Sequence, residues 1–278
     1  MALCKPRTFE CDTTFGTQSQ GYKLHVQCYH NNHTDMWEVA GLLFLSSETE
    51  EKVRTGVNFF KSSLPYRESQ VGKFFFFCDK DFQYINVLEE LFDCIVFLCS
   101  IHVFRYFKDK VFNGKAFWEG GEEPIPLSPD EKGQVLQQIK LIRDSPSEEL
   151  FNENQEKLKA MTEGLTVRPG NSKNAVQFCS YYETNWESCT FRWVWAFRKN
   201  LPTKGTNYTQ AAESTFRAIK HYAKVEFGAV TPTMEQIITI LPKILDQRSK
   251  DRGNKSLFRR MVIHNENPIY KLVRQVGI

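Results

Sequence analysis

Three carboxylates occupy positions from which a protein chain could do chemistry. Asp12 lies inside the first apolar stretch, where an ionised group is costly unless a partner neutralises it. Asp79 ends the near-continuous apolar run "KFFFFCD" of residues 73–79, and Glu213 lies near the start of a helical pattern at 209–228. Carboxylates that converge repel one another, and a hard divalent cation such as Mg²⁺ relieves that repulsion. These residues therefore indicate an acidic metal site.

Two of these assignments have an alternative. In "FCDKDF" either Asp79 or Asp81 could be the second ligand, and we prefer Asp79 because Asp81 is better explained as a helix cap. Glu213 borders the apolar face of its helix and begins a stripe that three basic residues continue: Arg217, Lys220 and Lys224. An acid above a basic stripe suits a metal ligand beside a phosphate backbone. It equally suits a solvated face on which Glu213 pairs with Arg217 across one turn.

Hydrophobic periodicity indicates the elements that must position the acids. We expect strands at 8–14, 22–29, 37–45, 73–79 and 94–100, a helix that follows a Ser47–Glu50 capping pattern, and helices at 81–92 and 101–112. Short polar connections make the first three strands an antiparallel meander. The later strands alternate with helices, which is typical of parallel strands joined by right-handed crossovers. Side chains at the ends of adjacent strands meet, so Asp12 and Asp79 can converge.

The rest of the chain breaks this alternation. Residues 113–130 are rich in Gly and Pro, and segments within 130–200, including "NWESCTFRWVWAFRKNL", read as helices. Two more helices follow, at 209–228 and about 232–247. We therefore predict an α/β fold: an RNase H-like mixed sheet, with three meander strands and two parallel ones, and an all-helical insertion. The expected parts are a first core segment (1–112), the insertion (113–207), the final core helices (208–247) and a basic C-terminal tail (248–278).

Composition places the chain among ordinary globular proteins. Hydrophobic residues make up 41% of the sequence and charged residues 25%, which is enough apolar surface for a core. The eight cysteines are scattered among apolar residues, as free thiols in a reducing compartment would be. The start of the sequence lacks the apolar core of a signal peptide, and no apolar run is long enough to span a bilayer. We expect an intracellular protein that does not bind membranes.

Charge is unevenly distributed along the chain. The whole sequence carries +3, but residues 248–278 hold eight basic residues against two acidic ones, a net of +6. A basic end on a nearly neutral body suggests contact with a polyanion, although a solvated tail or a nuclear import signal has the same composition. The residues we expect to contact DNA in this region are Arg248, Lys250, Arg252, Lys255, Arg259 and Arg260, together with the three basic residues that follow Glu213.

Four blocks in order resemble a known family. They are "CDTTFGTQSQGYKLHVQ", "LLFLSSETEE", "CDKDFQYINVLEELFDCIVFLCSIHVFRYFK" and "YTQAAESTFRAIKHY". Together they resemble the catalytic domain of Mutator-like (MULE) transposases. More closely, they resemble the RNase H-like domain of zinc finger SWIM domain-containing proteins, which look derived from such transposases. The resemblance extends over about residues 8–245.

This resemblance implies roles for particular residues. Asp12, Asp79 and Glu213 match the family's Asp-Asp-Glu (DDE) triad, which binds Mg²⁺ in active members. The family's C-x-x-H motif is Cys99 and His102 here, a pair that could bind zinc or orient the site. A zinc site needs two more ligands at workable distance, so we do not expect zinc. The resemblance implies a domesticated, nuclear protein that binds nucleic acid or protein partners without catalysis. The alternative is a metal-dependent DDE-type DNA transposase.

Overall fold

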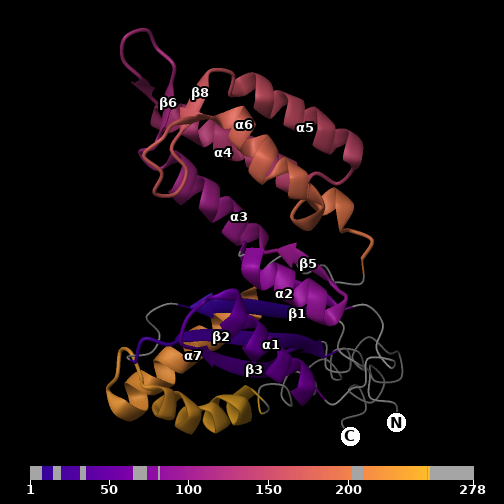
Figure 1. The fold of residues 1–278 in the computed structure, drawn as a ribbon, viewed down its shortest axis with the longest axis vertical. Coiled ribbons are helices and arrows are strands. Elements are labelled where there is room, and N and C mark those ends of the chain that lie inside the picture. Colours follow the sequence, from indigo (N-terminus) through magenta and orange to yellow (C-terminus); the bar gives the residue numbers. More distant parts are fainter. Residues whose placement is uncertain are drawn as a thin grey trace, which may run out of the picture. The chain divides into compact units, whose positions relative to one another are not determined.

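Five strands form the main sheet of the computed structural model (Figure 1), in the order β3-β2-β1-β4-β5. The structure describes residues 8–14, 20–31, 36–64, 74–80, 82–201, 209–248 and 250. The strands are β1 (Thr8–Thr14), β2 (Lys23–Asn31), β3 (Met36–Leu45), β4 (Phe75–Cys78) and β5 (Ile95–Leu98). β2 and β3 are antiparallel, whereas β1, β4 and β5 run parallel. The mixed sheet of an RNase H-like fold is thereby confirmed.

The chain divides into two compact units, and β1 contributes to both. The first unit contains residues 12–71 and the C-terminal part from Gln210, and the second contains residues 7–11 and 72–209. The boundary on β1 therefore falls between Cys11 and Asp12. Each unit has its own hydrophobic core.

In the first unit, helices cover the β2–β3 hairpin. Alternation along β2 sends Leu24, Val26 and Cys28 into a core with α7 (Gln210–Phe227) and a helix over residues 234–248. The alternate side chains of β2 point to the other face of the sheet, toward α1 (Glu50–Ser63). α1 packs closely on β3: if Gly56 of α1 had a Cβ atom, that atom would lie only 2.9 Å from the Leu45 side chain. β2 is therefore buried on both faces. The first turns of α7 are held against β2 by this core, because Ala211, Ala212 and Phe216 are part of it.

In the second unit, phenylalanines fill the space around the parallel strands. Phe9 of β1 stacks on Phe76 of β4 with ring centroids 5.0 Å apart, and Phe76 also contacts Phe92 of α2 (Phe82–Phe92). On the opposite face Phe77 packs against Phe97 of β5. The near-continuous apolar run of β4 thus reflects a strand that is covered on both sides.

The helix expected at 101–112 changes character halfway. It begins as α3 (Ser100–Tyr106) and continues as a π-helical turn over Phe107–Phe112. The wider turn directs Phe107, Val111 and Phe112 into the core of the second unit. Dense aromatic packing overrides the regular helical repeat here, and no local sequence signal reveals it.

The insertion is built on a helical hairpin but is not all-helical. α4 (Pro129–Asp144) packs along α5 (Glu148–Met161), and α6 (Phe178–Asn185) follows. A four-stranded antiparallel sheet accompanies them in the order β7-β6-β8-β9. Its strands are β6 (Ala116–Trp118), β7 (Ile125–Pro126), β8 (Leu165–Val167) and β9 (Val176–Gln177). The all-helical prediction was wrong because strands of two or three residues are too short to leave a periodic pattern.

Two local predictions also needed correction. The segment 185–201, expected to be a helix, forms 3₁₀ turns at Glu187–Arg192 and Trp195–Phe197, and the non-helical backbone of Cys189 interrupts the first. Burial of large side chains such as Trp186 and Trp193 decides this path rather than helix propensity. α1 is preceded by Thr49, without a side-chain cap, rather than by a Ser47 capping box. Asp81, the expected cap of α2, lies outside the described residues.

Ser128 begins α4 with a capping box, which gives a first testable prediction. The Glu131 amide donates to the Ser128 hydroxyl, and the Glu131 side chain accepts from the Ser128 amide in return. Ser128→Ala should lower the free energy of unfolding by about 1 kcal/mol, measured by urea denaturation. Ser128→Thr keeps the hydroxyl and should remain near the wild-type value. Equal stability of the alanine variant would contradict a capping role.

Within the part of the chain that the structure describes, no helix combines the length and the apolar character needed to cross a bilayer. This agrees with the sequence, which contains no apolar run of that length.

Candidate functional site

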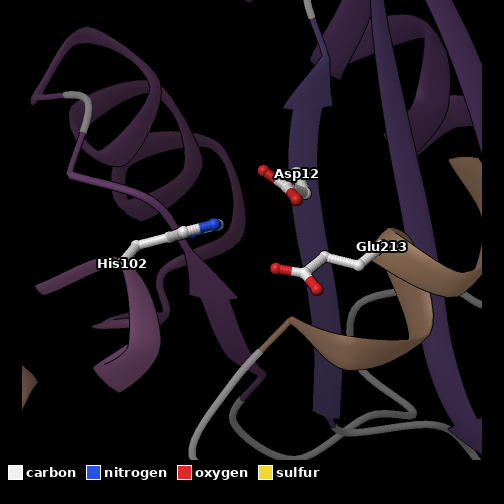
Figure 2. A group of neighbouring side chains, drawn as sticks. All are labelled: Asp12, His102 and Glu213. Atoms are coloured by element: carbon white, nitrogen blue, oxygen red, sulfur yellow. The ribbon is translucent and has the colours of Figure 1, made fainter. Parts of the chain in front are cut away.

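Asp12 and Glu213 form an acidic pair within the first unit. Asp12 lies near the end of β1, and Glu213 lies in the first turn of α7. Their carboxylates lie near each other (Figure 2), and ligand oxygens of the two lie within 4.8 Å. Both side chains are half-buried. Two like charges at this distance, partly removed from water, favour a bound cation.

The position of Glu213 follows from how α7 packs. Ala212, Phe216 and Ile219 enter the core against β2, which leaves Glu213 at the border of the buried face. The Thr215 hydroxyl donates back to the Ala211 carbonyl and also contacts the Cys28 thiol of β2 at 3.7 Å. The first turn of α7 is thereby fixed on the sheet. This geometry brings together two residues that are far apart in sequence, as the site prediction requires.

Thr13, the residue after Asp12, starts a network that the sequence did not reveal. Neighbouring residues of a strand face opposite sides, so Thr13 points away from α7. Its hydroxyl bonds to Nδ1 of His25 at 2.8 Å, and Nε2 of His25 lies 4.0 Å from Glu48. Burial lowers the pKa of His25 to about 4, so the ring is neutral at pH 7. The Thr13 amide donates to the Asp12 carboxylate at 2.9 Å, which links this network to the acidic pair.

Asp79 lies in the second unit, directly after β4. Its side chain is 61% exposed, and Oδ1 accepts the backbone amide of Lys80 at 2.6 Å. The same oxygen lies 3.9 Å from Nδ1 of His102, which stands in the first turn of α3. The second unit thus brings together Asp79 and His102, one residue from each of the two motifs that the sequence singled out.

Cys99 and His102 interact directly. Burial alone would raise the pKa of the Cys99 thiol, but hydrogen bonding to His102, the charge of His102 and a bond from Thr209 together lower it. The Thr209 amide lies 3.4 Å from the sulfur. Among the described residues, no cluster of Cys, His and acids suited to a metal includes Cys99. Cys179 and Cys189 instead contact backbone carbonyls of the insertion, those of Lys159 and Asn185.

The structure describes five of the nine basic residues that we expect to contact DNA. Arg217, Lys220 and Lys224 are exposed on α7. Arg248 lies in the helix over residues 234–248 and donates to the Ser214 hydroxyl at 3.1 Å, so it belongs to this helix rather than to the basic tail expected from residue 248. Lys250 pairs with Asp246 at 2.8 Å. The remaining four, Arg252, Lys255, Arg259 and Arg260, lie outside the described residues.

The comparison with known families concerns the first third of the chain. Residues 6–97 match the model of a family described as zinc finger SWIM domain-containing protein 1/3, RNaseH-like domain. The matched part extends from β1 into β5, so it includes Asp12 and Asp79 but neither Glu213 nor the insertion. The resemblance we drew from the sequence ran further, to about residue 245. No curated protein matches the chain.

Proposed function

We propose that this chain, whose residues 6–97 are an RNase H-like domain of the zinc finger SWIM domain-containing protein 1/3 type, is a transposase-derived nucleic-acid-binding protein. In this proposal Asp12 and Glu213 bind Mg²⁺, and basic residues of α7 bind the phosphate backbone beside it. The observation that carries the proposal is the acidic pair, with ligand oxygens within 4.8 Å. DNA is the partner that we expect, and the nucleus its place of action.

The residues present fit a hard divalent cation. Carboxylate oxygens are the ligands that Mg²⁺ prefers, and two of them leave positions for water or for a phosphate oxygen. Partial burial strengthens the repulsion within the pair, and therefore also the gain when a cation neutralises it. A bound cation would supply positive charge to a phosphate group at this point. Zinc is not expected here, since Zn²⁺ sites favour thiolate and imidazole ligands.

Asp79 is the proposed third ligand, on an argument from strand register. β1 and β4 are parallel, and the last paired residues are Glu10 and Phe77. Asp12 stands two residues after Glu10 within β1, and Asp79 stands two residues after Phe77, directly beyond the end of β4. If the register continues, the two acids fall at equivalent positions on neighbouring strands, on the same side. His102, 3.9 Å from Asp79, would then help to orient that carboxylate.

The α7 stripe provides the proposed contacts to phosphate. Arg217, Lys220 and Lys224 follow Glu213 along the helix and are exposed to solvent. A cation held by the acids and a row of basic side chains would together follow a polyanionic backbone. Such contacts give affinity without sequence preference.

The salt dependence of DNA binding tests the stripe. Replacing Arg217, Lys220 and Lys224 together by Gln should reduce the slope of log K against log salt by about 0.9 for each lost phosphate contact, about 2.7 in all. Fluorescence anisotropy with a duplex, over about 50–200 mM salt, measures the slope. The matched control replaces three exposed lysines of the insertion, Lys140, Lys157 and Lys173. Equal slopes for the wild type and the α7 variant would remove α7 from the interface.

Metal dependence tests the proposed function as a whole. Isothermal titration with Mg²⁺ or Mn²⁺ should detect binding to the purified chain, and DNA affinity should fall when EDTA replaces Mg²⁺. A chain that binds DNA equally well in EDTA would still be a nucleic-acid-binding protein, but the acidic pair would have no part in it. A chain that binds no duplex at any of these salt concentrations contradicts the proposal.

Catalysis is the second candidate, and the strand register is the observation that favours it. Nucleic-acid binding requires no cleavage of a phosphodiester, and Asp12 and Glu213 already lie together within one unit. A DDE-type strand transferase also needs Asp79, because cleavage of a phosphodiester in such enzymes uses two divalent cations about 4 Å apart. Incubation of supercoiled plasmid with the chain and Mn²⁺ distinguishes the two. Nicking that Asp79→Asn abolishes would establish the enzyme, whereas intact plasmid favours binding without catalysis.

A further inference from the structure

Lys80 attaches the Asp79 carboxylate to the insertion. Its backbone amide donates to Asp79 Oδ1 at 2.6 Å. Its ammonium group donates to the Asn185 carbonyl at 2.5 Å and lies 3.7 Å from the centre of the Trp186 ring. One residue thus holds the carboxylate with its main chain while its side chain is fixed more than a hundred residues away in the sequence.

The platform under Lys80 is rigid. Trp186 is completely buried, and its ring packs on Phe107 with centroids 4.7 Å apart and on Tyr106 at 5.3 Å. Its indole N–H donates to the Tyr181 hydroxyl, and its carbonyl accepts the indole N–H of Trp193 at 3.1 Å. A group bound to such a ring has little freedom to move.

The same segment also covers the outer edge of β5. Arg192 donates to the Val96 carbonyl at 2.7 Å and forms a forked ion pair with Glu89 of α2. Arg198, which is 1% exposed, donates to the Leu98 carbonyl at 3.2 Å. Edge strands normally leave such groups to solvent, so these contacts fix the strand that leads into Cys99 and His102.

We propose that the insertion segment Asn185–Arg198 is the positioning element for Asp79 and His102, with Lys80 as the link. The inference rests on the proposed function, because it gives the insertion a role at the same cation site. The segment does not contact the cation. It holds the Asp79 carboxylate in one orientation, and groups that orient metal ligands typically change metal affinity by about 10- to 100-fold.

The direction in which Lys80→Met changes cation affinity distinguishes a positioning role from a purely electrostatic one. Lys80→Met removes a positive charge beside an acidic site, which by Coulomb's law alone would tighten the binding of a cation. If the main role of Lys80 is to position the Asp79 carboxylate, the same substitution weakens the binding of the cation. Trp186→Phe changes no charge but alters the platform, so it tests the same inference independently.

The experiment titrates Mn²⁺ into the full-length wild type and three variants, and follows amide hydrogen exchange without metal. Lys80→Met and Trp186→Phe should each lower Mn²⁺ affinity by about tenfold and speed up exchange at the Lys80 amide. Lys157→Met is the control, because Lys157 is exposed on α5 and pairs with Glu153 of the same helix, outside the segment Asn185–Arg198. It should change neither measurement.

The outcomes distinguish the inference from the proposed function. Unchanged exchange at the Lys80 amide in both variants overturns the inference, whatever the cation does. Unchanged or tighter Mn²⁺ binding by Lys80→Met and Trp186→Phe also overturns it. A wild type that binds no Mn²⁺ overturns the cation site of the proposed function, and faster exchange at the Lys80 amide in the variants then still supports the positioning of Asp79 by the insertion.

Discussion

Asp12→Asn and Glu213→Gln should each lower the affinity of the chain for Mn²⁺ by about 100-fold or more. At an effective dielectric of about 20, two unit charges 4 Å apart interact by about 4 kcal/mol, and a dication roughly doubles this. The interaction energy lost with one carboxylate is therefore larger than about 2.7 kcal/mol, the free energy that corresponds to a 100-fold change in affinity. Calorimetric titration of purified protein at pH 7 measures the affinity.

The same variants should have the opposite effect on the metal-free protein. Asp12 and Glu213 repel each other when no cation separates them, so neutralising either should leave the melting temperature in EDTA unchanged or higher. Mg²⁺ should raise the melting temperature of the wild type but not that of the variants. Glu226→Gln, on the last turn of the same helix and paired with Lys243, is the control. Wild-type affinity in both site variants would show that the pair is not a cation site.

The wild type should lose stability as pH falls from about 6.5 to about 4, and His25 should cause a large part of the loss. Burial lowers the pKa of His25 from 6.5 to about 4 in the folded chain. In this window the unfolded chain binds a proton at His25 that the folded chain does not, so the free energy of unfolding falls with pH. A difference of about 2.5 pH units corresponds to an upper limit of about 3 kcal/mol.

Denaturation at several pH values between 4 and 7 tests this. His25→Gln can still form a hydrogen bond with the Thr13 hydroxyl, and it removes the titrating ring, so its curve should be flatter than the wild-type curve by up to that amount. His221→Gln, at an exposed position of α7, should leave the curve as it is. The comparison uses the slope of the free energy of unfolding against pH, because the stability of the variant at pH 7 also reflects changes in packing. Parallel curves for the wild type and His25→Gln would assign the acid sensitivity to other groups.

The sequence predicted the sheet well because its signals are local. β4 is a short apolar run between polar residues, and the meander strands alternate or end at turns, so each can be recognised without its partners. Asp12 and Asp79 could be singled out for the same reason, because a carboxylate inside or at the end of an apolar strand is conspicuous. Glu213 was a candidate because a basic stripe follows it, but a Glu at the border of an amphipathic helix is ordinary, so the residues alone left its role open and the resemblance favoured the metal ligand.

What could not be predicted depends on contacts across the chain. Lys80 looks like any surface lysine until Trp186 lies beneath it, and the low pKa of His25 comes from burial that no pattern within β2 reveals. The turns around Cys189 replace a helix because two tryptophans are buried there. Tertiary packing determines these features, whereas local propensity determined the strands.

The pairing of α7 with β2 has a consequence for how the protein is made. Leu24, Val26 and Cys28 are covered by a helix that begins at Gln210, and the contact between Cys28 and Thr215 joins residues 187 positions apart. At a synthesis rate of about 5–20 residues per second, roughly ten to forty seconds separate the emergence of these partners from the ribosome. During that interval the apolar face of the hairpin has no α7 to cover it, while the intervening insertion can already fold. We therefore expect the nascent chain to need chaperones that shield apolar strands, and we expect translation speed through the insertion to influence how much folded protein a cell obtains.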